Sequence, residues 1–327
     1  MAQLLPAGMN PGAHPQQSAY PGGPPTSLYP GGSPYPNQAQ SPYPGQQQPF
    51  GTSPRPGYQP QFGAPATPQQ LEMFMQSLRA TIAEKRLDAF YPPHDVQKVH
   101  AIATRAAASV EELCQTWRLP REIGADVAKI GLYDVVLYID DSGSMAFEEG
   151  GERIKDLELV LQRVSHAAGL LDEDGISVRF MNSTPPPQML DKIRRTDQID
   201  ALMREVKFKG LTPMGTELRR KIIDDIVRRA QSNSLAKPVL VITLTDGTPA
   251  GEAREAVFDT IKYANAELSK TRYGPGAIAL QFAQLGNDTK AREFLAKLDA
   301  DPTVGHLIDC TSSEFWVSLG LFLAPPS

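Results

Sequence analysis

Two kinds of apolar pattern alternate along the chain from residue 132 onward. Short runs rich in β-branched and aromatic residues predict strands, and stretches with an apolar residue every third or fourth position predict helices. Strands are predicted at 133–139, 175–180, 238–244, 277–285 and 306–310. Helices are predicted at 154–168, 189–206, 218–230, 253–268, 290–298 and 314–323. This alternation predicts an α/β fold with a doubly wound, mostly parallel sheet that carries helices on both faces.

Residues 69–131 show only the helical pattern. Apolar residues of the first predicted helix lie on one stripe: Leu71, Met75, Leu78 and Ile82. Further helices are predicted from about 95, at 110–117 and at 122–130. Helices this short need a packing partner in water, so we expect this segment to pack on the domain that follows. The alternative is that the first helix docks on another protein through its apolar stripe.

Residues 1–68 have a different composition. They contain a single charged side chain, Arg55, and more than half of the chain's 30 prolines. Too few large apolar residues are present to offset the entropy cost of folding, so a disordered tail is predicted. Its repeated Tyr-Pro units suit recognition or self-association, and the alternative is a solvated leader without a dedicated partner. The predicted organisation is therefore 1–68 tail, 69–131 helical segment and 132–327 α/β domain.

Charge and composition exclude several functional classes. The formal net charge is −5 and no Lys/Arg-dense stretch occurs, so a nucleic-acid partner is not expected. The first residues lack the pattern of a signal peptide, and no run of about 18 apolar residues predicts a membrane span. We therefore expect a cytoplasmic protein, in which Cys114 and Cys310 are buried, reduced thiols.

Polar residues follow the two most apolar predicted strands. Residues 140–145 read Asp-Asp-Ser-Gly-Ser-Met after the first, and residues 245–248 read Thr-Asp-Gly-Thr after the third. Ligands of open parallel sheets bind at this carboxyl edge. If residues 140–144 form an extended loop, alternate side chains point the same way, and carboxylate and hydroxyl oxygens suit a hard cation such as Mg²⁺. The predicted ligands are Asp140, Ser142, Ser144, Thr212 and Asp246.

These segments resemble the metal-ion-dependent adhesion site of von Willebrand factor A domains, and the resemblance covers about residues 132–322. It implies that Ser142, Ser144 and Thr212 coordinate the cation through hydroxyls, while Asp140 and Asp246 act directly or through water. It also implies Mg²⁺ as the cation, with Mn²⁺ and Ca²⁺ as alternatives, and a partner that supplies an Asp or Glu carboxylate. The simpler alternative is that the serines cap a helix and Asp246 forms a turn. Three neighbouring acids are expected on a solvated face: Asp141, Glu217 and Asp225.

Enzyme motifs are missing where this fold would need them. No glycine-rich phosphate or dinucleotide loop follows the first predicted strand. Leu244 stands where a phosphatase of the haloacid dehalogenase type needs a nucleophilic aspartate. We therefore expect a binding protein without catalytic residues, in which a bound cation captures a protein partner. The alternative is an intracellular scaffold that assembles through its tail and whose cation only stabilises loops.

Overall fold

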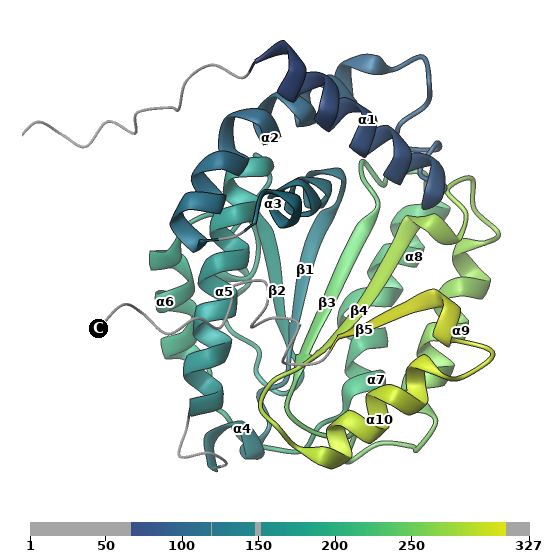
Figure 1. The fold of residues 1–327 in the computed structure, drawn as a ribbon. Helices are drawn as coiled ribbons and strands as arrows, with labels where there is room; N and C mark the ends of the chain where they lie inside the picture. The colour runs from purple at the N-terminus through teal and green to yellow at the C-terminus, as the bar shows by residue number, and fades with distance from the viewer. Residues whose placement is uncertain (1–66, 119, 148–151, 312–327) are drawn as a thin grey trace, which may run out of the picture. The chain divides into compact units, whose positions relative to one another are not determined.

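The computed structural model describes residues 67–118, 120–147 and 152–311 (Figure 1). The predictions for the 1–66 part of the tail and for a closing helix at 314–323 lie outside the described residues. Among the helices that are described, none combines the length and the apolar character needed to cross a bilayer.

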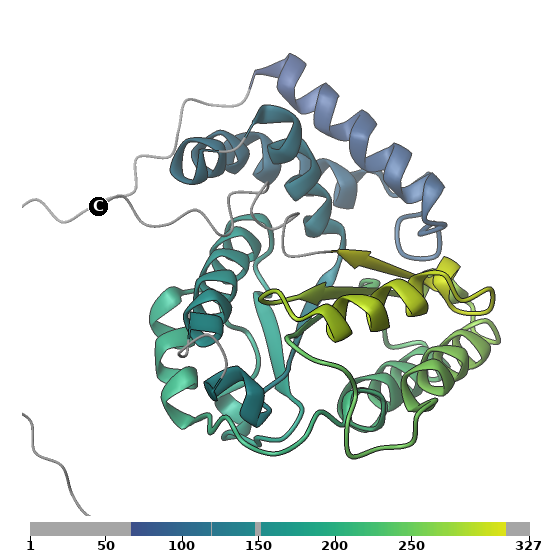
Figure 2. The same ribbon diagram turned by 60° about the horizontal axis from the view of Figure 1, so that its bottom comes forward.

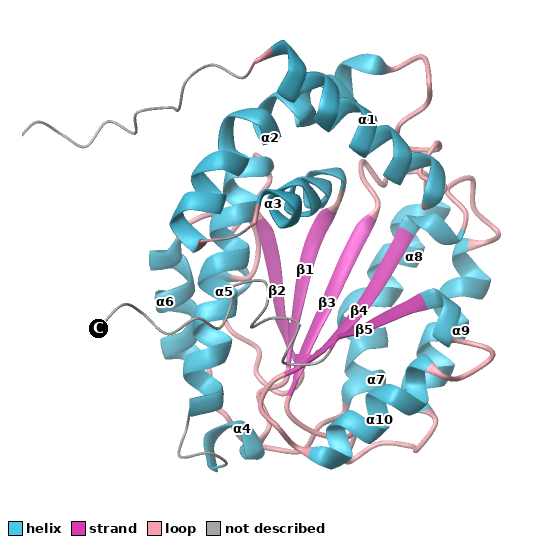
Figure 3. Ribbon diagram, viewed as in Figure 1, coloured by secondary structure: helices cyan, strands magenta, loops and turns pink. Residues whose placement is uncertain are grey.

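A five-stranded, all-parallel sheet forms the centre of the fold (Figure 3). The strands are β1 (Asp134–Ile139), β2 (Ile176–Phe180), β3 (Val239–Thr245), β4 (Ile278–Gln284) and β5 (Ile308–Thr311), in the order β2-β1-β3-β4-β5. The predicted α/β class is therefore confirmed. Ile139 pairs with Phe180 on one side and with Leu244 on the other, so the three strands end at the same level. The chain segments that follow them emerge side by side.

Helices cover both faces of the sheet, and alternate residues of β1 point to opposite cores (Figure 2). Val135, Leu137 and Ile139 pack with α5 (Glu152–Leu171) and α6 (Thr196–Glu205). Tyr138 belongs to the other core, which includes α7 (Met214–Leu218), α8 (Asp224–Gln231) and α9 (Ala256–Leu268). β2 is buried at every second residue, so one of its faces is more exposed than the other.

Several element boundaries differ from the predictions. The helix predicted at 189–206 begins only at Thr196, after a short 3₁₀ turn. The helix predicted at 218–230 starts earlier and contains a π-helical turn between α7 and α8. The remaining elements after β1 are α4 (Gly143–Phe147), η3 (Pro187–Met189), η4 (Arg219–Ile223), η5 (Pro275–Ala277), α10 (Thr289–Asp299) and η6 (Gly305–Leu307).

The N-terminal helices lie at the amino edge of the sheet, opposite α4 (Figure 1). They are α1 (Pro68–Glu84), α2 (Val96–Trp117), α3 (Arg121–Ala128) and η1 (Lys129–Leu132). Thr67 and Gln70 form a capping box that starts α1. The Tyr91 hydroxyl donates a 2.6 Å hydrogen bond to the carbonyl of Leu132, just before β1. This bond ties the segment to the beginning of the central strand.

The second and third helices predicted for this segment form one continuous helix. α2 runs unbroken over 22 residues because no glycine or proline interrupts it, and its buried face is rich in alanine. The prediction of two helices was therefore wrong. Cys114 on this helix is buried and outside any disulfide, as expected, whereas Cys310 on β5 is only half-buried.

Candidate metal centre

The loops that follow β1 and β3 bring four of the predicted ligands together. Ser142 Oγ and Ser144 Oγ lie 3.0 Å apart, and Ser144 Oγ donates a 3.0 Å hydrogen bond to Asp246 Oδ1. The prediction of an extended loop was wrong, because α4 begins at Gly143 and Ser144 lies in its first turn. The helical turn still places both hydroxyls on the side that faces Asp246.

Asp140 is fully buried at the base of the site. Its Oδ1 accepts the backbone N–H of Ser142 at 3.0 Å, and its Oδ2 accepts the hydroxyl of Thr245 at 2.7 Å. Burial raises the pKa of this carboxyl to about 6; the charge of Asp246 adds to the rise, and the Thr245 and Ser142 hydrogen bonds oppose it. Asp140 and Asp246 thus place two acidic groups in a region shielded from solvent.

Thr212 lies in the loop between the other two. Gly210 O accepts the backbone N–H of Gly143 at 3.2 Å, and Thr212 O accepts the backbone N–H of Ala250 at 2.9 Å. Gly210 has a φ of 100°, a conformation that favours glycine. Thr212 itself is buried, with 5% of its surface exposed. The backbone therefore fixes its loop to the Ser142–Ser144 loop on one side and to the loop after β3 on the other.

Glu252 holds the start of α7 behind this loop. Its carboxylate accepts the backbone N–H of Gly215 at 2.9 Å and that of Thr216 at 2.7 Å. These are N–H groups of a first helical turn, which have no partner within the helix. Sequence reasoning missed this contact because Glu252 is 36 positions away from Thr216. It orients the helix that follows Thr212.

Asp141 has a structural role, and the expectation of a solvated face was wrong for it. The side chain is fully buried. Its two carboxylate oxygens accept the backbone N–H groups of Asn182 and Ser183, each at 2.7 Å. Asp141 therefore fixes the loop after β2 to the site. The expectation holds for Asp225, whose side chain is 45% exposed, but not for Glu217, whose side chain is only 17% exposed and pairs with basic side chains of its own helix.

Arg153 is a site residue that the sequence analysis missed. It lies in the first turn of α5, is 2% exposed, and donates from Nη1 to Asp246 Oδ2 at 2.6 Å. One oxygen of Asp246 thus faces Ser144 and the other faces Arg153. A signal was present, because Arg153 lies four residues before Leu157 on the buried stripe of α5. A charged residue on an apolar stripe usually has a buried partner.

The donor set suits a hard divalent cation. It offers hydroxyl and carboxylate oxygens, without the nitrogen and sulfur ligands that favour zinc or copper. Asp140 and Asp246 are both fully buried, and a cation would relieve the repulsion between their charges. Ser142, Ser144 and Asp246 are already in contact and would need little rearrangement to share an ion. The described residues therefore fit the predicted group, and cation binding itself stays a prediction.

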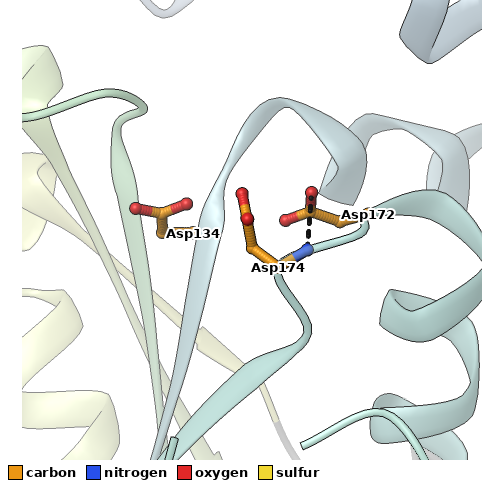
Figure 4. Close-up of side chains that lie close together, drawn as sticks. All are labelled: Asp134, Asp172 and Asp174. Atoms are coloured by element: carbon orange, nitrogen blue, oxygen red, sulfur yellow. Dashed lines mark hydrogen bonds between the residues drawn. The ribbon is translucent and has the colours of Figure 1, made fainter. Parts of the chain in front are cut away.

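A second acidic cluster lies at the opposite edge of the sheet (Figure 4). Carboxylate oxygens of Asp134, Asp172 and Asp174 lie within 4.8 Å of one another, an arrangement that could hold a divalent cation. Lys237 Nζ lies 2.5 Å from Asp172, 3.1 Å from Asp174 and 3.9 Å from Asp134. Because this ammonium already contacts all three carboxylates, we interpret the cluster as an ion-pair network. Asp134 is the first residue of β1, so the network lies a full strand length from Asp140.

Comparisons with known proteins gave matches only among solved structures. No family model matches the sequence, and neither does any curated protein. The manganese-loaded TRAP protein of Plasmodium vivax is similar over 58% of this chain and 72% of its own, with 16% identity and a TM-score of 0.38. The pilus adhesin SpaC of Lactobacillus rhamnosus GG has the same identity and TM-score over 58% of this chain and 29% of the adhesin. Similarity this low assigns neither a family nor a function.

Proposed function

We propose that residues 132–327 form a cation-dependent protein-binding module of the von Willebrand factor A type. Ser142, Ser144 and Thr212 would hold a divalent cation, Mg²⁺ in the first instance, together with Asp140 and Asp246. When bound, the cation supplies a positive centre to which a carboxylate of a partner protein can attach. The observation that carries this proposal is the contact of Ser144 Oγ with Ser142 Oγ and with Asp246 Oδ1, since it joins loops 102 positions apart.

The surface beside the site supports a protein ligand. The described residues include four exposed large apolar side chains, and two of them lie beside the site: Phe147, 85% exposed, ends α4, and Leu211, 60% exposed, precedes Thr212. A Cβ on Gly143 would lie 3.8 Å from both the Phe147 ring and the carbonyl of Gly210, so these loops are close neighbours. Exposed apolar groups next to a polar centre are typical of interaction sites. We infer that the partner's acidic residue is flanked by an apolar one.

The proposal assigns the site to binding and not to catalysis. Ser144 contacts Ser142 and Asp246, and Asp140 is held by the Ser142 N–H and the Thr245 hydroxyl, so the role left to the cation is to attract an anion. The scaffold alternative also places a cation here but gives it only a structural role. The binding proposal predicts that a soluble carboxylate ligand competes with the partner for the site, and the scaffold alternative predicts that it does not.

Cation binding is tested by titrating the full-length chain with Mn²⁺ in a calorimeter. The wild type is compared with Ser142→Ala and Thr212→Val, and with Ser165→Ala as a control. Ser165 is a buried serine of α5 whose hydroxyl donates to the carbonyl of Gln162, away from the site. We expect one site whose affinity falls by about tenfold or more in the first two variants and is unchanged in the control, because each variant removes one oxygen ligand.

Ligand binding is then tested with immobilised peptides. Each pair consists of one peptide with Asp beside a leucine and one with Asn in the same place. Binding to both peptides is compared in Mg²⁺ and in EDTA. The proposal predicts binding of the Asp peptides in Mg²⁺ only, and loss of that binding in Ser142→Ala. Binding that persists in EDTA, or a wild type that takes up no Mn²⁺, would overturn the proposal. Cation uptake without any preference for Asp would favour the scaffold.

A further inference from the structure

Arg153 and the candidate cation share one carboxylate. The side chains of Arg153 and Asp246 are 3% and 0% exposed, and Nη1 lies 2.6 Å from Oδ2. The other oxygen of Asp246 accepts from Ser144, which is a predicted ligand. Arg153 is therefore a fixed positive charge directly behind a carboxylate of the site. Because both side chains are shielded from water, this charge is only weakly screened.

A charge count shows what Arg153 changes. Asp140 and Asp246 contribute two negative charges, and a divalent cation would neutralise them. With Arg153 in place, the loaded site is more positive by one charge than it would be with a neutral residue there. Asp141 and Glu252 are also nearby, but each is held by backbone N–H groups and is common to both cases. The difference of one charge therefore comes from Arg153 alone.

We propose that Arg153 is a built-in counter-ion that sets the selectivity of the site. It opposes cation binding, because it pairs with Asp246 and repels a second positive charge. It favours an anionic ligand once the cation is bound, because it adds one positive charge beside the cation. Arg153 is thus a specificity-determining residue that need not contact the ligand. This inference rests on the proposed function, since it concerns the same site.

Replacing Arg153 should move two affinities in opposite directions. Arg153→Gln should bind Mn²⁺ about tenfold more tightly and, once loaded, bind acetate about tenfold more weakly, because a nearby charge is removed from a buried region. Arg153→Lys keeps the charge and should stay close to the wild type in both. Arg163→Gln removes a charge from the same helix ten positions further on and serves as the control. Damage to the site would instead weaken both affinities together.

The experiment uses the full-length chain of all four proteins. Mn²⁺ affinity is measured by calorimetry, and acetate binding to the loaded site by its effect on the relaxation of solvent protons. Melting temperatures with and without saturating Mn²⁺ give a further readout. Mn²⁺ should raise the melting temperature of Arg153→Gln by more than it raises that of the wild type. That larger rise is expected because the cation restores a counter-charge to Asp246.

The outcomes separate this inference from the proposed function. Opposite shifts in Arg153→Gln, with wild-type behaviour in Arg153→Lys, support the counter-ion. Weaker or unchanged Mn²⁺ binding in Arg153→Gln overturns it, while the proposed function stands as long as Ser142→Ala still loses Mn²⁺. If neither the wild type nor Arg153→Gln takes up Mn²⁺, both are overturned. Uptake by Arg153→Gln alone would show that the arginine suppresses cation binding but would overturn the proposed function of the wild type.

Discussion

Asp141 gives the sharpest test of how the site loops are held. Replacing it with alanine removes the acceptor for the backbone N–H groups of Asn182 and Ser183, each at 2.7 Å, in a fully buried position. A hydrogen bond to a charged group contributes roughly 1.5 to 3 kcal/mol. The two bonds together, reduced by the desolvation that the carboxylate no longer suffers, give an expected loss of about 3 to 5 kcal/mol.

Urea denaturation at pH 7 in EDTA, followed by circular dichroism, measures this loss. For a domain of this size the melting temperature should fall by roughly 6 to 20 °C. Asp225→Ala is the matched control: its carboxylate is 45% exposed and pairs with its own helix, so it should cost about 0.5 kcal/mol or less. If Asp141→Ala lost no more than this control, the carboxylate would not be holding the loop after β2, and the argument would be refuted.

Two further predictions concern a glycine beside the site and the ion-pair network at the amino edge of the sheet. Gly215→Ala should lose about 2 to 4 kcal/mol in the same assay and weaken Mn²⁺ binding, because its Cβ would meet backbone atoms of Val257 and Ala256 at 2.3 and 2.4 Å. Gly247→Ala, with nothing within 4 Å, should be tolerated, and equal losses in the two would contradict this. Lys237→Met should cost about 1 to 3 kcal/mol by leaving three carboxylates without their ammonium, which is 18% exposed. Mg²⁺ should raise the melting temperature of the wild type and of Lys237→Met, but not that of Ser142→Ala. If Mg²⁺ stabilised Ser142→Ala and not Lys237→Met, the cation would bind at the amino edge.

The α/β fold was predictable because the spacing of apolar residues along the chain distinguishes its strands from its helices. The apolar run that became β3 is buried almost throughout, β2 is buried at every second residue, and the helix between β1 and β2 has one buried apolar stripe. The boundaries were less predictable. Whether 96–117 is one helix or two depends on the absence of a helix breaker, and the π turn at Arg219–Ile223 has no signature in the apolar pattern.

Only the part of the site that follows from the sheet topology was predictable. Parallel strands that end at one level bring Asp140 and Asp246 together, and this follows from strand order. The buried roles of Asp141 and Arg153 depend on which way a side chain turns at the end of an element. Asp141 is one position from Asp140, so an extended chain already points the two side chains apart, but the sequence does not predict that Asp141 meets the loop after β2.

The N-terminal helices lie at one edge of the sheet and the candidate metal centre at the other (Figure 1). A strand of six residues spans about 20 Å, and the strands run directly between the two edges. Tension between a bound partner and whatever precedes Pro68 would therefore load β1 and its neighbours along their length. All five strands are parallel, so such a pull would shear their hydrogen bonds together and not open them one at a time. Under such tension the sheet would act as a mechanical link as well as a platform for the site.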